Sequence, residues 1–197
     1  MASKRKEEIL KVALNLFNEK GVTTVTTNHI AAEMSISPGN LYYHFRNKEE
    51  IIRAIVEDMY VTWDVMYEQD PKTSFDLNAL RQMLRVGYSL NWQFRFFYRD
   101  VSLILRADPS LKTRYFEMRD QRIDQQLEMV RTLSQAMLID LPSEQDFRRI
   151  LTAGWQISDN WLAFQELEED WDEENIESHI EEGVEVLLAL YKPYFKL

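Results

Sequence analysis

The side chains best suited to chemistry in this sequence crowd together between positions 26 and 48. They carry hydroxyl, amide, imidazole and ammonium groups, which bond phosphate oxygens and base edges, and they include flat aromatic rings. Few of them are charged, and the clearest cation among them is Lys48. The set predicts a surface that contacts double-stranded DNA. Its members are Thr26, Thr27, Ser37, Pro38, Gly39, Asn40, Tyr42, Tyr43, His44 and Lys48.

Two short helices are expected to position these side chains. Thr26 or Thr27 can cap a first helix that runs to about Met34, while Ser37 and Pro38 suit the start of a second, which reaches about Phe45. Two such helices joined by three or four residues are what a helix-turn-helix requires, with the second helix in the major groove. An apolar set would lock them together: Ile30, Ala31, Met34, Ile36, Leu41 and Phe45.

The run from Thr27 to Ile51, TNHIAAEMSISPGNLYYHFRNKEEI, resembles the signature of the TetR family, and the resemblance covers roughly residues 5–55. It implies a homodimer on a palindromic operator, usually a repressor released when a small ligand enters the C-terminal domain. Ser35 stands where the family usually has a glycine with positive φ, at a cost of about 1 kcal/mol. Asn40 replaces a common Thr or Ser and can reach an adenine edge bidentately.

The remaining sequence predicts an all-α fold with about nine helices. The chain has only five glycines and five prolines in 197 residues, which favours long helices over a sheet with many tight turns. We expect a helix-turn-helix DNA-binding domain at 1–47 and a helical ligand-binding and dimerisation domain at 48–197, with a linker near 70–74. Longer helices are expected at about 5–20, 47–69, 76–91, 92–106, 109–138, 144–167 and 173–191.

Aromatic side chains are dense in the middle of the chain, where the resembled family encloses a ligand. Most of these rings are expected to be core, but rings with polar tips beside arginines could meet an acidic or amphipathic molecule. We predict a small hydrophobic or amphipathic effector of unknown identity. The candidate ligand-binding residues are Trp92, Phe96, Tyr98, Arg99, Tyr115, Arg119, Trp155 and Asp159.

The last two helices each carry a broad apolar face with a glycine in mid-helix. Glycine there costs about 1 kcal/mol, so close approach of another helix is the expected compensation. A four-helix dimer bundle is the family expectation, and packing of both faces inside one chain is the alternative. The candidate homodimer residues are Gly154, Ile157, Trp161, Ile180, Gly183 and Leu187.

Charge, residue composition and missing motifs disfavour several classes of function. The net charge is −10, but residues 1–53 carry +2 and the rest −12, so only the N-terminal part suits DNA. The chain has no cysteine and three scattered histidines, and it lacks phosphate-loop and catalytic motifs. We therefore expect no enzyme, metal or cofactor, no membrane partner, and a cytoplasmic location. A ligand-independent regulator or activator, and a binding module without a DNA role, remain alternatives.

Overall fold

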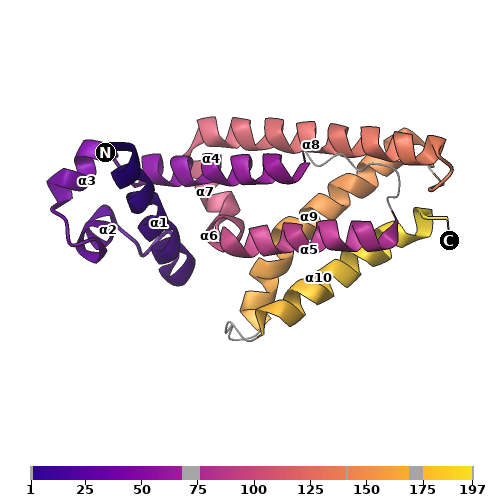
Figure 1. Cartoon of the computed structure of the whole chain (residues 1–197). Helices are drawn as coiled ribbons and strands as arrows, with labels where there is room; N and C mark the ends of the chain where they lie inside the picture. The colour runs from indigo at the N-terminus through magenta and orange to yellow at the C-terminus, as the bar shows by residue number, and fades with distance from the viewer. Residues whose placement is uncertain (1, 68–75, 141, 169–174, 197) are drawn as a thin grey trace. The chain divides into compact units, whose positions relative to one another are not determined.

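A computed structural model describes residues 2–67, 76–140, 142–168 and 175–196. These residues form ten α-helices, a short 3₁₀ helix and no sheet, which confirms the predicted all-α class (Figure 1). The expected linker at 70–74 lies outside the described residues. The helices are α1 (Ala2–Lys20), α2 (Thr27–Glu33), α3 (Pro38–His44), α4 (Lys48–Tyr67), α5 (Leu77–Gln93), α6 (Arg95–Arg99), α7 (Val101–Ala107), α8 (Pro109–Gln135), α9 (Glu144–Glu168), α10 (Ile176–Tyr191) and η1 (Lys192–Tyr194).

The expected single helix at 92–106 is divided in the structure. Phe94 and Asp100 have φ near −110° and positive ψ, outside the helical region, and they bound the five residues of α6. Arg99 ends α6, and α7 begins at Val101. The division raises the helix count from the expected nine to ten among the described residues.

Contacts divide the chain into two compact units, at other positions than the expected boundary after residue 47. Unit 1 comprises Met1–Gln69 with Phe94–Leu111, and unit 2 comprises Asp70–Gln93 with Lys112–Leu197. The difference arises because α4 and α6 both contact α1. The helix-turn-helix therefore shares one core with α4, α6 and α7.

The core of unit 1 is built on α1. Ile9, Ala13 and Phe17 have no exposed surface, and the Phe17 ring lies 5.5 Å from the ring of Phe96 in α6. The buried Asn18 side-chain oxygen accepts a 3.0 Å hydrogen bond from the Phe96 N–H. This bond satisfies a backbone donor at the start of α6 and fixes α6 against α1.

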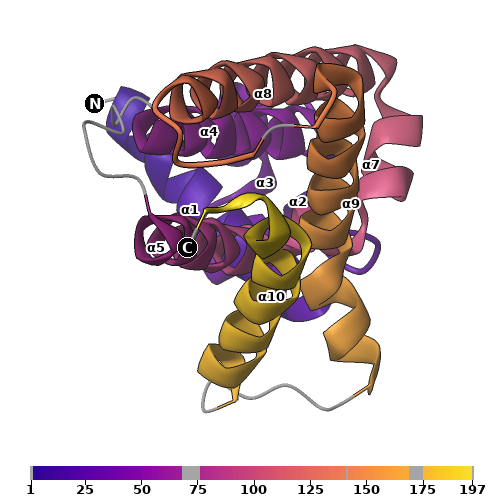
Figure 2. The same ribbon diagram turned by 90° about the vertical axis from the view of Figure 1, so that its right-hand side faces the viewer.

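Unit 2 has two apolar clusters. In one, α5 and α9 pack against α10 around Tyr88, Leu162 and Val184 (Figure 2). In the other, the second half of α8 packs against the start of α9 and residues near the C-terminus. Among the described residues, each helix is either too short or too polar to span a lipid bilayer.

The turn between α2 and α3 has the positive φ expected at Ser35, with a value of 52°. Because a side chain disfavours this conformation, Ser35→Gly should raise the free energy of unfolding by about 1 kcal/mol in urea titrations. Ser89→Gly is the matched control, since Ser89 is exposed in mid-α5, where glycine should instead lower stability by about 0.5 kcal/mol. Equal signs for the two substitutions would contradict the argument from φ.

Candidate functional site

Side-chain caps fix where α2 and α3 begin. The Thr26 hydroxyl accepts a 3.3 Å hydrogen bond from the His29 N–H, and the His29 ring accepts one of 3.4 Å from the Thr26 N–H. The Ser37 hydroxyl accepts a 3.2 Å bond from the Asn40 N–H, with Pro38 in the first helical position. Each cap satisfies a donor that the helix leaves unpaired, so the predicted starts are confirmed.

One face of the two helices is buried and the other faces solvent. Ile30, Ala31, Leu41 and Phe45 are at most 2% exposed, as predicted for the set that locks the helices together. Met34 and Ile36, from the same set, are half-buried. The opposite face carries most of the predicted DNA-contacting residues: Thr26, Ser37, Pro38, Gly39, Asn40, Tyr42 and Tyr43 are exposed, and Thr27, His44 and Lys48 are half-buried.

The two tyrosines of α3 both point outward, so neither serves the core. Tyr42 is 49% exposed and Tyr43 is 82% exposed. The Tyr42 hydroxyl lies 3.1 Å from that of Thr27, which joins α3 to α2 on the outer face. The Tyr43 ring meets the His44 ring edge-on at 5.1 Å. These aromatic rings and hydroxyls can make both apolar contacts and hydrogen bonds in a groove of DNA.

Lys48 has an internal role that its sequence position did not reveal. Its ammonium donates hydrogen bonds of 2.7 Å to the Val22 carbonyl and 3.1 Å to the Val25 carbonyl. Lys48 therefore holds the loop before α2 against the start of α4, which leaves one of its three protons for a phosphate. Arg46 is the more accessible cation: its side chain is 91% exposed, and its Nε lies 4.0 Å from a carboxylate oxygen of Glu50.

An ion pair inside unit 1 anchors α4 beyond the helix-turn-helix. Arg53 donates bonds of 2.9 and 2.6 Å to one carboxylate oxygen of Asp108, whose other oxygen accepts the Leu111 N–H at the start of α8. Burial favours the neutral form of Asp108, but the Leu111 and Arg53 bonds outweigh it and lower the pKa of Asp108. The carboxylate caps α8 and ties it to α4.

The predicted ligand-binding residues separate into groups. Phe96, Tyr98 and Arg99 belong to unit 1, where Phe96 is fully buried and Arg99 donates a 3.2 Å bond to the Asn18 carbonyl. Trp92, in unit 2, packs against the cluster around Tyr88. Phe96, Tyr98 and Arg99 thus belong to a different compact unit from Trp92 and from the remaining four.

Those remaining four form a polar group in unit 2. The Trp155 indole N–H lies 3.1 Å from the Tyr115 hydroxyl and 3.0 Å from the Asp159 carboxylate, and the Tyr115 hydroxyl donates to the same carboxylate. Burial raises the pKa of Asp159 to about 6, although the two hydrogen bonds and the nearby Arg119 charge oppose the shift. Within the described residues, no cluster of His, Asp and Glu could hold a metal ion.

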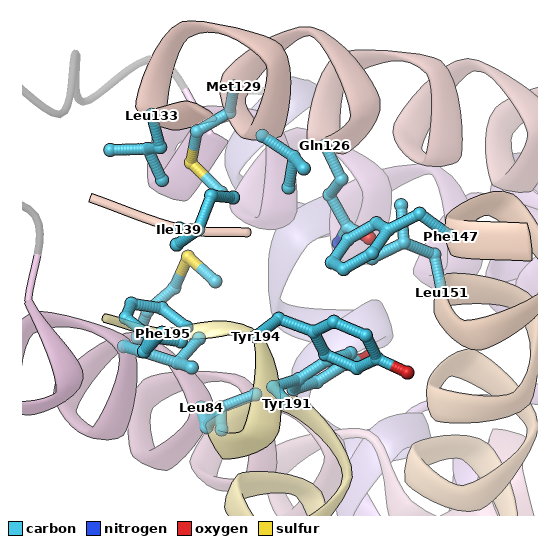
Figure 3. A pocket seen from close by; sticks show the side chains of 13 residues that line it. Leu84, Gln126, Met129, Leu133, Ile139, Phe147, Leu151, Tyr191, Tyr194 and Phe195 are labelled. Atoms are coloured by element: carbon cyan, nitrogen blue, oxygen red, sulfur yellow. The ribbon is translucent and has the colours of Figure 1, made fainter. Parts of the chain in front are cut away.

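A separate pocket lies near the C-terminus and contains none of the predicted ligand residues (Figure 3). Its volume is about 60 Å³. Its walls come from α5, the second half of α8, Ile139 in the loop after it, the start of α9 and residues 191–195, with Leu84, Met129, Phe147 and Phe195 among them. These segments are far apart in the sequence, and none of them carries a recognisable motif.

Two protein-family models together match most of the chain. The family model for bacterial regulatory proteins of the tetR family matches residues 9–55, and the model for the bacterial transcriptional repressor TetR matches residues 63–196. A crystal structure of a TetR-family transcriptional regulator from Marinobacter aquaeolei VT8 has a TM-score of 0.86 and 31% identity, covering 97% of this chain and 91% of that one. The chain belongs to the TetR family.

More distant relatives cover less or share only the fold. The biofilm operon negative transcriptional regulator IcaR of Staphylococcus epidermidis is 33% identical over 79 residues, which are 40% of this chain and 43% of IcaR. The chain thus spans less than half the length of the curated relatives it matches. The ketosteroid transcriptional regulator KstR2 of Mycobacterium tuberculosis is 16% identical with a TM-score of 0.70, covers 98% of this chain and 96% of its own, and shares the fold.

The predicted dimer residues of this TetR-family protein pack within one chain. A Cβ on Gly154 would overlap the Tyr191 hydroxyl, and one on Gly183 would lie 2.7 Å from the Trp161 ring. The close approach that both glycines require is therefore supplied by side chains of the same chain. Gly183 is buried with Ile180 and Leu187, and Ile157 and Trp161 pack against the same cluster. Exposed apolar side chains on α9 lie elsewhere, at Phe164 and Leu167.

The raised pKa of Asp159 predicts a pH effect on stability. The Asp159 carboxyl has its ordinary pKa of 3.8 in the unfolded chain and a pKa of about 6 in the folded chain. Between these two pH values the folded chain keeps a proton that the unfolded chain releases, so the free energy of unfolding falls as the pH rises. Asp159→Asn cannot titrate, and its carbonyl oxygen still accepts from Tyr115. Urea titrations should show the wild type losing stability relative to Asp159→Asn between about pH 4 and 6.

Asp140→Asn is the control for this comparison, because it changes an exposed carboxylate elsewhere in unit 2. Its difference from the wild type should not follow the same curve. A constant gap between the wild type and Asp159→Asn across this range would contradict the assignment.

Proposed function

We propose that the chain is a homodimeric repressor that binds a palindromic DNA operator through the outer face of α2 and α3 and is released by a small ligand. The observation that carries the proposal is the division of α3 into a buried apolar face and an exposed polar one. Asn40, Tyr42 and Tyr43 lie on the exposed face, where a major groove can reach them. Two protomers would place their α3 helices about 34–36 Å apart, or a multiple of that distance.

Hydrogen bonding and a few cations would supply the affinity. Residues 1–53 carry a net charge of only +2, so phosphate neutralisation gives limited help, and the acidic remainder is repelled by DNA. Asn40 is exposed and can bond an adenine edge, which makes it the best candidate for reading sequence. Gly39 is exposed and carries no side chain, and the nearest atom to a Cβ built there is the Ser37 hydroxyl at 4.0 Å, so a DNA backbone can come close.

The exposure of α3 also weighs against the alternative of a binding module without a DNA role. That alternative needs the recognition helix buried, whereas Tyr43 is 82% exposed. The pocket in unit 2 favours a ligand-responsive regulator over a ligand-independent one. For the homodimer we propose contact through exposed parts of α9 that include Phe164 and Leu167. We expect the protein to act in the cytoplasm, with no enzymatic activity.

Salt dependence of binding to DNA from the region upstream of its own gene tests the proposal. Binding should weaken steeply with salt, because each phosphate contact releases counterions. Arg46→Gln should reduce the slope of log K against log salt by about 2, one for each protomer of the dimer. Fluorescence anisotropy at several salt concentrations measures both quantities.

Arg149→Gln is the matched control, since the Arg149 side chain is 65% exposed on α9, in unit 2. It should leave the slope unchanged. Binding by the wild type that does not respond to salt, or equal slopes for Arg46→Gln and the wild type, would count against the proposed DNA interface.

A further inference from the structure

The pocket near the C-terminus has a lining that selects against ions. Ten of its thirteen lining residues have side chains without oxygen or nitrogen, and the others are Gln126, Tyr191 and Tyr194. None of the thirteen is charged at neutral pH. A carboxylate or ammonium placed inside would lose its water without gaining an opposite charge. The lining therefore disfavours an acidic ligand, which is one of the two kinds that the arginines near residue 99 suggested, the other being amphipathic.

We propose that this pocket binds an uncharged molecule with a single alkyl chain, such as a medium-chain alcohol. This inference rests on the proposed ligand-responsive function and names the class of its ligand. The pocket is small, with a volume of about 60 Å³, so it suits a flexible chain of methylene groups better than rigid fused rings. Met83 and Met129 lie in the walls, and flexible thioether side chains of this kind let a pocket widen around a chain.

The chain's own C-terminal residues close one side of the pocket. Tyr194 and Phe195 contribute to its lining, and the Tyr194 ring meets the Phe147 ring edge-on at 5.3 Å (Figure 3). This wall is attached to the loop after α8 by backbone hydrogen bonds, from Asp140 N–H to the Tyr194 carbonyl at 2.7 Å and from Lys196 N–H to the Leu138 carbonyl at 3.0 Å.

An ion pair adds to this attachment. The Lys196 ammonium lies 2.7 Å from the Asp140 carboxylate. Together these contacts hold the segment 194–196 against the loop after α8 and keep this side of the pocket closed.

Calorimetric titration of the full chain at pH 7 with three octyl compounds tests the ligand class. The probes are octan-1-ol, octanoate and octylammonium, which share one alkyl chain and differ in charge. The alcohol should bind, and each ion should bind at least tenfold more weakly because of the uncharged lining. Equal binding of octanoate and octan-1-ol would overturn the proposal.

Substitutions locate the binding. Leu84→Trp should fill the pocket and reduce octan-1-ol affinity at least tenfold, whereas Leu103→Trp, at a 46% exposed position in unit 1, should leave it unchanged. Should Leu84→Trp fail to fold by circular dichroism, Phe195→Ala tests the same claim. Removing that ring opens the wall and should weaken octan-1-ol binding at least fivefold. Wild-type affinity in a folded Leu84→Trp or Phe195→Ala variant would overturn the assignment to this pocket.

Octan-1-ol binding and DNA binding are measured separately, so the two proposals can fail separately. If no octyl compound binds while the chain still binds DNA in a salt-dependent way, the ligand class is wrong and the DNA-binding proposal stands. If octan-1-ol binds the wild type but not Leu84→Trp, and no DNA fragment is bound, the pocket stands and the regulator proposal fails.

Discussion

The outward face of α3 depends on the burial of its inward face. A helix of seven residues is too short to be stable alone in water, so its conformation must come from packing. Leu41 and Phe45 supply that packing against a core that contains Ile30 and Phe17. The Ser37 cap and the left-handed Ser35 then set where α3 starts and how the chain enters it. With these constraints met, Asn40 and Tyr43 need no role in the core.

Within the same unit, polar contacts of Lys48 and Arg53 connect the helix-turn-helix to α4, and α4 to the start of α8. Lys48 ties the first residues of α4 to the loop before α2, and Arg53, further along α4, pairs with Asp108. Asp108 caps α8, a helix that begins in unit 1 and continues into unit 2. A change that moves the start of α8 therefore acts on the Arg53 pair and on α4. Within unit 1, the Arg53 pair and the Asp108 cap therefore link α4 to the first residues of α8.

Local sequence signals predicted the DNA-binding end of the fold and little of the pocket. Thr26 and Ser37 lie within a few residues of the backbone groups that they cap, and Asn40 lies on the exposed face of the helix that Ser37 begins. The local sequence was therefore enough to predict their roles. The break at Asp100 carried no Pro or Gly signal, and the expected helix at 92–106 crossed it. The pocket walls come from five separate segments, and neither spacing nor composition brings Leu84 and Phe195 together.

The glycines and arginines show how tertiary contacts change a local interpretation. Gly154 and Gly183 correctly predicted close approach, but Tyr191 and Trp161 of the same chain supply it. Arg99 suggested contact with an acidic or amphipathic ligand, and its guanidinium bonds the Asn18 carbonyl within unit 1. In both cases the residue type indicated the kind of contact, and only the fold could identify the partner.

Selection of bound sequences from a random DNA pool tests the central claim most directly, because every possible operator competes in the same pool. We expect enrichment of a two-fold symmetric sequence whose half-sites are about one helical turn, or a multiple of it, apart. Asn40→Ala should relax the selected bases at one position of each half-site. A pool that shows no enrichment, or the same enrichment after both Asn40→Ala and Tyr43→Ala, would contradict a DNA-reading role for α3.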